Sequence, residues 1–337
     1  MHNKVLVIYT GGTIGMVQDE NGSLQPFALD RIYDAVPQLR HCAYQIDSCQ
    51  LDHIIDSSNM TPALWVDIAE IVEREYDRYD GFVVLHGTDT MAYTASALSF
   101  MFDNLAKPVV LTGSQLPLAM LRSDGRENII SALEIASAQN LCIPEVCIFF
   151  ENHLYRGNRS TKVSSENFDA FHSYNYPSIA RAGINIAYKQ HLVRPITNQP
   201  LQVRKQFDER IAVLKLFPGI TASVVRTLLG TPDLQGAIIE TYGSGNAPTE
   251  PWFIDALSEA IGRGVVILDV TQCKSGAVKL RQYAASCDLD RIGVISGHDI
   301  TVEAAVTKMM YLLGNYGHDR ALVARLLGES LRGEISL

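Results

Sequence analysis

The stretch VLVIYTGGTIG, residues 5–15, joins a run of five apolar residues to a turn that contains two glycines and Thr13. A short apolar run that ends at glycines is typical of a buried strand. The stretch GFVVLHGTDT, residues 81–90, repeats this plan with Thr88 and Asp89 in its turn. In an open α/β sheet, reactive groups gather where strands end on their carboxyl side. We therefore expect two hydroxyls and a carboxylate to converge there.

Segments with strand and helix character alternate through the first half of the chain. Further apolar runs lie at 108–113 and 146–150, and helical periodicity follows Thr61-Pro62, where Thr61 is a candidate N-cap and Pro62 a candidate first helical residue. Such alternation predicts an α/β fold: a mostly parallel sheet with flanking helices. The segment after Thr90 is also helix-prone.

The chain has 337 residues, which suits two domains, because single cores stop growing near about 250–300 residues. Strand-like runs resume at 211–216, 236–240 and 264–268, and a helical pattern follows at 302–313. Between them the periodicity breaks around two prolines, as in an interdomain linker. We expect a larger N-terminal α/β domain at 1–190, a linker at 191–210 and a smaller C-terminal α/β domain at 211–337.

Composition excludes several classes of protein. Hydrophobic residues make up 47% of the chain and charged residues 19%, as in ordinary globular proteins. The formal net charge is −9 and no basic cluster interrupts it, so we expect no nucleic-acid partner. No apolar run approaches the roughly 20 residues of a membrane helix, and the first residues lack the pattern of a signal peptide.

The six cysteines are dispersed and form no CxxC pair. That spacing favours free thiols in a reducing compartment over a disulfide framework, so we expect a cytoplasmic protein. The nine histidines include no HExxH or comparable ligand set, so we expect no metal site. Gly113-Ser114-Gln115 lacks the closing glycine of a serine nucleophile elbow, and the first turn lacks the Gly-Lys-Ser/Thr ending of a phosphate-binding loop.

Each candidate residue also has an ordinary structural interpretation. Thr13 is suited to cap a helix after a tight turn, and Asp89 to cap the helix expected from Thr90. A lysine in a polar loop, such as Lys162, is usually a solvated surface residue. The sequence Asp-Ser-Ser-Asn before a helix, residues 56–59, is an everyday turn composition, and the loop that contains Asn246 is glycine-rich and flexible. His86 is expected to make structural hydrogen bonds.

The ordered set of motifs resembles the bacterial-type L-asparaginases, and most closely the cytoplasmic type I branch of the asparaginase/glutaminase family. The resemblance covers almost the whole chain, and the motifs that carry it are Thr10–Gly15, Asp56–Met60, His86–Met91, Thr112–Gln115, Arg122–Gly125, Tyr155–Lys162, Tyr242–Pro248 and Leu331–Glu334. Each motif alone is modestly specific, whereas the ordered set is very specific.

The resemblance implies hydrolysis of L-asparagine to L-aspartate and ammonia through a covalent acyl-enzyme, without a cofactor, as in asparagine catabolism. It makes Thr13 the nucleophile and Thr88 the second catalytic threonine. Lys162 would lie beside Thr88 and Asp89, and these three catalytic residues would assist one or both proton transfers. Asp89 would also hold the substrate's α-ammonium through a charge-assisted hydrogen bond. The substrate-binding residues that it implies are Asp56, Ser57, Ser58, Thr88, Asp89 and Asn246, the last reaching the site from a neighbouring subunit of a homodimer or homotetramer.

Two positions depart from the family pattern. Many members carry a tyrosine on the lid after the first motif, whereas this chain has Ser23 or Leu24 there, and Tyr33 is the nearest downstream tyrosine. Some cytoplasmic members bind asparagine as an effector through an arginine at the position of Glu240, while Thr161 and Cys273 of that site are kept. A negative charge there would oppose a carboxylate, so we expect weak or absent cooperativity.

Two other functions remain open from the sequence. The amide-hydrolysing subunit of an archaeal-type tRNA amidotransferase shares these motifs, but carries an extra amino-terminal domain and needs a tRNA-binding partner. A catalytically silent effector-binding module would keep the fold alone. Retention of both threonines, Asp89 and Lys162 favours the enzyme over the silent module.

Overall fold

The computed structural model describes residues 3–18, 24–26, 32–138, 141–280 and 284–336. The chain divides into two compact units, Met1–Lys205 and Gln206–Leu337. The division falls within the segment 191–210, and the domain boundaries expected from the sequence stay a prediction. Each unit is an α/β structure with its own sheet, which confirms the predicted fold class.

The first unit is built on an eight-stranded sheet with the order β13-β12-β9-β8-β7-β5-β1-β4. The strands β4, β1, β5, β7 and β8 run parallel, and β9, β12 and β13 are added antiparallel. Their bounds are β1 Lys4–Gly11, β4 Gln45–Ile55, β5 Gly81–Leu85, β7 Val109–Thr112, β8 Val146–Phe150, β9 His153–Arg156, β12 Ala180–Arg181 and β13 Ala187–Tyr188. Short antiparallel pairs join β2 (Met16–Gln18) to β3 (Leu24–Pro26), β6 (Phe102–Asp103) to β14 (Gln202–Val203) and β10 (Thr161–Lys162) to β11 (Phe171–His172).

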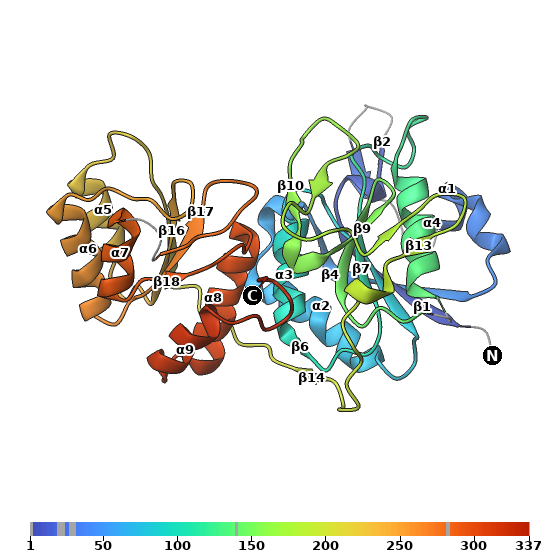
Figure 1. The fold of residues 1–337 in the computed structure, drawn as a ribbon. Coiled ribbons are helices and arrows are strands. Elements are labelled where there is room, and N and C mark those ends of the chain that lie inside the picture. The colour runs from blue at the N-terminus through green and yellow to red at the C-terminus, as the bar shows by residue number, and fades with distance from the viewer. Residues whose placement is uncertain (1–2, 19–23, 27–31, 139–140, 281–283, 337) are drawn as a thin grey trace. The chain divides into compact units, whose positions relative to one another are not determined.

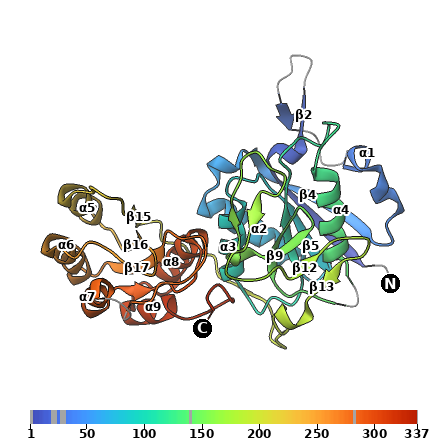
Figure 2. The same cartoon turned by 45° about the horizontal axis from the view of Figure 1, so that its top comes forward.

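Helices cover both faces of this sheet, with α2 and α3 on one face and α4 on the other (Figures 1 and 2). Val5, Val7 and Tyr9 of β1 belong to one buried cluster with Ile129 and Leu133 of α4. The alternation of side chains along a strand sends the residues between them to the opposite face. This two-sided burial explains why the sequence shows unbroken apolar runs. The helices of the unit are α1 Ile32–Ala35, α2 Pro62–Glu75, α3 Met91–Met101 and α4 Gly125–Ala136.

The order of the parallel strands fixes where a ligand can bind. Counted along the chain, β1, β4, β5, β7 and β8 stand in the order 2-1-3-4-5, a common doubly wound arrangement. In such sheets the crevice lies outside the carboxyl ends of the first and third strands, where the order reverses. Those two strands are β1 and β5, which lead into the turns of Thr13 and Thr88.

The second unit has a parallel sheet with the order β15-β16-β17-β18. Helices α5, α6 and α7 lie along one of its faces, and α8 and α9 along the other (Figure 2). The bounds are β15 Ile211–Lys215, β16 Gly236–Thr241, β17 Val266–Thr271, β18 Ile295–Ser296, α5 Ala222–Leu229, α6 Pro251–Gly262, α7 Ala284–Ile292, α8 Val302–Tyr316 and α9 Arg320–Leu327.

A buried ion pair fastens the C-terminal segment to α8. The Nζ atom of Lys308 lies 2.7 Å from a carboxylate oxygen of Glu334, and both side chains are fully buried. Glu334 also accepts hydrogen bonds from the backbone N–H groups of Leu331 and Arg332. Burial raises the pKa of Glu334, but Lys308 and these donors outweigh it and lower the pKa below its usual range.

Most predicted elements occur near their expected positions, while the segment before the second unit is less irregular than expected. Pro62 begins α2 and Thr61 is its N-cap, although the Thr61 side chain makes no capping hydrogen bond. Gln202–Val203 forms β14 inside the predicted linker, because it pairs with residues about a hundred positions earlier. Such long-range pairing leaves no local signal.

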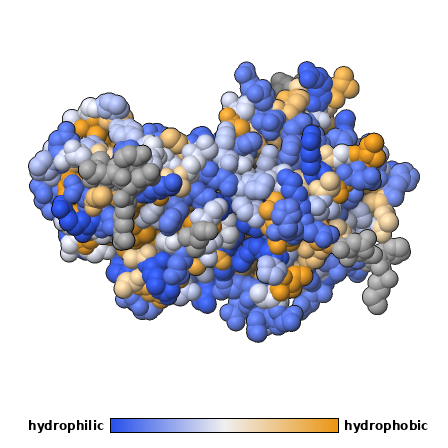
Figure 3. All heavy atoms as spheres, in the orientation of Figure 1, coloured by the Kyte–Doolittle hydropathy of each residue, from blue (hydrophilic) through white to orange (hydrophobic). Residues whose placement is uncertain are grey.

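Polar residues predominate on the face drawn in Figure 3, with apolar residues interspersed. Scattered apolar side chains are normal on soluble domains. No helix within the described part of the chain is both long and apolar enough to cross a membrane.

Candidate active site

Three glycine turns at the carboxyl ends of β1, β5 and β7 touch one another. A methyl group added to Gly12 would lie 2.4 Å from the Cα atom of Gly87, and one added to Gly113 would lie 2.4 Å from the carbonyl oxygen of His86. Gly12 has a φ of +87°, which favours glycine. Absence of side chains at these positions lets the backbones approach and brings the adjoining residues together.

Thr13 begins a short 3-10 turn, Thr13–Gly15, directly after this contact. Its side chain is half-buried and makes no hydrogen bond to another residue that the structure describes. The turn at Gly87 lies against the Gly12 backbone. The first hydroxyl is thus available beside the turn that carries Thr88, as the sequence predicted.

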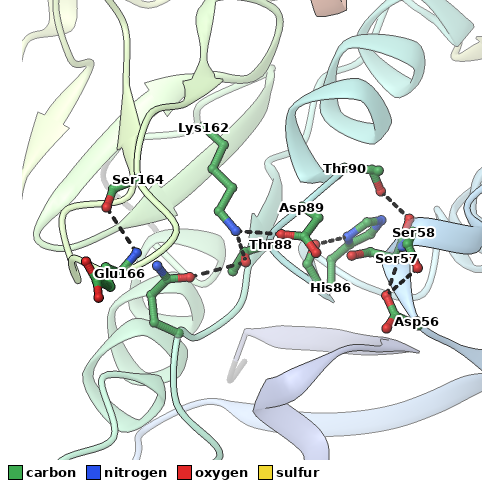
Figure 4. Close-up of polar contacts among 12 residues, drawn as sticks. Asp56, Ser57, Ser58, His86, Thr88, Asp89, Thr90, Lys162, Ser164 and Glu166 are labelled. Atoms are coloured by element: carbon green, nitrogen blue, oxygen red, sulfur yellow. Dashed lines mark hydrogen bonds and ion pairs between the residues drawn. The ribbon is translucent and has the colours of Figure 1, made fainter.

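Thr88, Asp89 and Lys162 form the polar centre of this region (Figure 4). The Lys162 ammonium donates to the Thr88 hydroxyl oxygen at 2.7 Å and to a carboxylate oxygen of Asp89 at 2.7 Å. The Asp89 side chain is 66% exposed and the Lys162 side chain only 17%. The structure therefore brings together the three residues that the resemblance grouped, with the Asp89 carboxylate facing solvent.

Lys162 lies on a strand rather than in the polar loop expected from the sequence. It is the second residue of β10, which pairs with Phe171 of β11. The local sequence is polar, but the pairing partner lies nine positions along the chain and supplies the order. This pairing holds the lysine at the site, so the solvated-surface interpretation is wrong.

Asp89 does not cap the following helix, because α3 begins at Met91 and its N-cap is Thr90. The Thr90 hydroxyl makes no capping bond either, and instead donates to the carbonyl oxygen of Ser57 at 2.7 Å. This bond ties the turn after β4 to the turn after β5. A methyl group on Gly87 would meet the Ser57 hydroxyl at 2.5 Å, so buried Ser57 lies directly against the site.

Asp56 and Ser58 are bonded to each other beside Ser57. An Asp56 carboxylate oxygen accepts from the backbone N–H and from the hydroxyl of Ser58, both at 2.9 Å. The hydrogen bond from the Ser58 backbone lowers the pKa of Asp56 most, and the bond from the Ser58 hydroxyl lowers it further. Asp56 is thus an ionised N-cap of the 3-10 turn Ser57–Asn59, in keeping with the turn composition of this stretch. Its role toward a substrate carboxylate stays a prediction.

His86 makes the structural hydrogen bonds expected of it. Its Nδ1 atom lies 2.6 Å from the Gly87 carbonyl oxygen, and its Nε2 atom lies 2.9 Å from the Thr94 hydroxyl. The Trp65 indole donates to the same hydroxyl. These partners fit a neutral imidazole that donates from Nδ1 and accepts at Nε2. Burial lowers the pKa of His86 to about 4, although the Gly87 carbonyl opposes the shift.

His86 should make stability depend on acid. The unfolded histidine has a pKa of about 6.5, so its contribution is complete above pH 6.5 and is lost as the pH falls toward 4. As the pH falls from 6.5 to 4, we expect the loss of this contribution to lower the free energy of unfolding by up to about 3 kcal/mol. Urea unfolding of the unmodified chain and of a His86→Gln variant at several pH values measures this. Parallel pH dependence of the two proteins would contradict the prediction.

Asn246, an expected substrate-binding residue, and Glu240, at the expected effector position, lie in the second unit. Asn246 closes a tight turn, in which its backbone N–H donates to the Tyr242 carbonyl oxygen at 2.8 Å. Glu240 is not the unpaired charge that the sequence argument assumed, since the Lys215 ammonium lies 3.2 Å from its carboxylate. Lys215 and Glu240 stand opposite each other in the register of β15 and β16. The repulsion expected from Glu240 is therefore partly neutralised.

In the part of the segment after the first motif that the structure describes, no tyrosine is placed at Thr13. Ser23 lies outside the described residues, and Leu24 begins β3. The Tyr33 hydroxyl donates to the carbonyl oxygen of Ile46, which pairs with Val5 near the opposite end of β1 from Thr13. Tyr33 is accordingly placed away from the nucleophile, and it is not the missing lid tyrosine.

Gln115 also lies at the site, although the sequence indicates it only as the last residue of the motif Thr112–Gln115. It follows β7, the strand next to β5, and its side-chain carbonyl accepts from the Thr88 hydroxyl at 3.3 Å. The carboxyl ends of parallel strands meet at one edge of the sheet, so the turn after β7 could have been expected beside the turns after β1 and β5.

Within the described residues, no cluster of three or more histidines, cysteines or carboxylates is placed to hold a metal ion.

Comparisons with known proteins find similar sequences and structures along almost the whole chain. The family model described as "Asparaginase, N-terminal" matches residues 4–194, and that described as "Glutaminase/Asparaginase C-terminal domain" matches residues 210–327. L-asparaginase 1 of Escherichia coli K12 is 45% identical, covering 99% of this chain and 98% of that protein. The 60 kDa lysophospholipase of Mus musculus is 43% identical over 99% of this chain, which spans 63% of its length. The crystal structure of L-asparaginase I from Vibrio cholerae matches with a TM-score of 0.91 and 42% identity over both whole chains.

Proposed function

Because the chain belongs to the asparaginase family, we propose that it is an L-asparaginase, an amidohydrolase that converts L-asparagine and water to L-aspartate and ammonia. The observation that carries the proposal is the contact of Lys162 with Thr88 and Asp89 beside the Thr13 turn. The similarity of E. coli L-asparaginase 1 over both whole chains supports the same substrate.

In the proposed mechanism, Thr13 Oγ1 attacks the carbon of the side-chain amide. The C–N bond then breaks, and ammonia leaves with the proton that the hydroxyl gives up. Water attacks the resulting acyl-enzyme, which releases aspartate and restores the Thr13 hydroxyl. Backbone N–H groups at the glycine turns stabilise the oxyanion, and such donors commonly contribute about 2.7–4 kcal/mol each.

The second hydroxyl and its neighbours serve proton transfer and binding. Thr88, held by Lys162, assists one or both proton transfers, since a hydroxyl needs a neighbouring base to act. The exposed Asp89 carboxylate binds the substrate's α-ammonium, while the turn of Ser57 and Ser58 orients the α-carboxylate. No cofactor takes part.

The assembly and location are part of the proposal. We infer a homodimer or homotetramer in which Asn246 completes the site of a neighbouring subunit. The six cysteines are free thiols in the described structure, which supports a reducing, cytoplasmic compartment.

Ammonia release by the purified protein, measured with asparagine and with glutamine, tests the function. One additional methylene changes binding by only about 1–3 kcal/mol, so some glutamine turnover is compatible with the proposal. Absence of ammonia from both amides would instead support a catalytically silent binding module. Activity that requires a tRNA-binding partner would support the amidotransferase subunit.

A further inference from the structure

Gln115 spans the gap between the second hydroxyl and the loop that follows Lys162. Its side-chain nitrogen donates to the backbone carbonyl oxygen of Asn167 at 3.0 Å, and its side-chain oxygen accepts from Thr88 at 3.3 Å. These two partners lie 52 and 27 positions away in the chain. One amide therefore joins three separate segments at the site.

Hydrogen bonds to neighbouring side chains fix the backbone of the Gln115 turn. The Asp124 carboxylate accepts from the N–H of Gln115 at 3.0 and 3.1 Å and from that of Leu116 at 3.1 Å. The Asn128 amide donates to the carbonyl oxygen of Gly113 at 3.0 Å, which fixes the same turn two residues before Gln115. Side chains whose support is itself hydrogen-bonded hold a functional group in one geometry.

The loop that carries the Asn167 carbonyl group, to which the Gln115 amide donates, is also fixed by hydrogen bonds. The Ser164 hydroxyl oxygen accepts from the backbone N–H group of Glu166 at 3.1 Å (Figure 4). It also accepts from the backbone N–H group of Asn167 at 2.9 Å. These bonds fold the loop after β10 and set the position of the Asn167 carbonyl group. Gln115 thus meets a fixed acceptor at one end and Thr88 at the other.

This arrangement dictates the direction of the hydrogen bond at Thr88. A backbone carbonyl can only accept, so the NH₂ group of Gln115 must face Asn167 and its carbonyl oxygen must face Thr88. A carbonyl oxygen can only accept, so the Thr88 hydroxyl hydrogen points toward Gln115. The oxygen lone pairs of Thr88 then face the Lys162 ammonium, which donates to them.

We propose that Gln115 is a positioning residue that orients the Thr88 hydroxyl for proton transfer, with Asn167 fixing the orientation of its amide. The inference rests on the proposed function, because it assigns Gln115 a part in the same reaction. Because the Thr88 hydrogen is held by Gln115, a lone pair of the Thr88 oxygen stays directed at the Lys162 ammonium. Gln115 thereby holds Thr88 in the geometry in which a proton can pass between the lysine and the hydroxyl oxygen.

Two substitutions separate this role from simple packing. Gln115→Met keeps the length of the side chain and removes both hydrogen bonds. We expect kcat for asparagine to fall about 3- to 10-fold, the loss typical of one ordinary hydrogen bond, with little change in KM. Gln199→Met, at an exposed glutamine of the segment after the first sheet, is the matched control and should retain the full kcat.

Gln115→Glu supplies a readout that packing alone would not move. A protonated glutamate can donate to Asn167 and accept from Thr88, whereas an ionised one cannot donate. Charged groups near this position are Lys162 and Asp89 across Thr88, Asp124 at the Gln115 backbone, and Glu166 in the loop of Asn167. We expect the kcat of Gln115→Glu relative to the unmodified enzyme to fall as pH rises. The same ratio for Gln115→Met should be flat.

The outcomes are distinguishable. If the unmodified protein releases no ammonia from asparagine, the proposed function fails. If it is active and Gln115→Met keeps its kcat, or changes KM alone, the inference about Gln115 is overturned. Should Gln115→Met not fold, Ser164→Ala loosens Asn167 without touching Gln115 and should lower kcat in the same direction by a smaller factor. Unchanged kcat in that variant would then overturn the inference.

Discussion

Thr13→Ala is expected to release ammonia from asparagine at a rate lower by about 10⁴-fold or more, the scale seen when a hydrolase loses its nucleophile. Thr88→Val should lower kcat by a comparable factor, because Lys162 would lose its hydroxyl partner in the site. Both residues lie in turns at strand ends rather than among the apolar runs, so the unfolding free energy should change little. Steady-state assays on the folded variants measure the effect.

The controls for this prediction use the same chemistry. Thr13→Ser keeps a hydroxyl and should recover part of the activity, and Thr197→Ala, at an exposed position, should behave as the unmodified enzyme. A soluble Thr13→Ala or Thr88→Val variant with near-normal kcat would refute the two-threonine mechanism.

Removal of the Lys308 ammonium is expected to be the largest single loss of stability. Lys308→Met leaves the Glu334 carboxylate fully buried without its cation. Breaking a buried ion pair in this way costs about 3–5 kcal/mol of unfolding free energy. Lys308→Met combined with Glu334→Gln removes the uncompensated charge, so we expect the double variant to be more stable than the single one.

Fluorescence can assign this loss to the second unit. The chain has two tryptophans, Trp65 in the first unit and Trp252 in the second. In a Trp65→Phe background, urea unfolding followed through Trp252 reports on the C-terminal unit alone. A loss below about 1 kcal/mol for Lys308→Met would mean that the buried pair contributes no more than a surface ion pair.

The strands and turns of the site were predictable, because their signals are local. The apolar runs before Gly11 and Gly87 gave both the strands and the position of the two threonines. The support of the site was not predictable in this way. β10 exists through its pairing with β11, and Gln115 acts through a backbone carbonyl 52 positions away. Such contacts depend on the folded sheet and leave no periodicity in the chain.

Competition between partners explains the remaining differences. Asp89 and Thr90 have the composition of helix caps, yet their side chains are bonded to Lys162 and to the turn after β4. Glu240 has the charge that the sequence argument used, but Lys215 across the strand register partly neutralises it. In each case a tertiary partner replaces the role that the local sequence predicts.

The pairing of β10 with β11 also sets the moment in synthesis at which the protein can act. A nascent chain that has emerged from the ribosome up to residue 150 already contains Thr13, Thr88 and the five parallel strands. It still lacks Lys162 and the strand β11, which ends at His172 and pairs with the strand of Lys162. Because domains generally fold as units during translation, the growing polypeptide should remain inert toward its substrate until that hairpin has left the ribosome and docked.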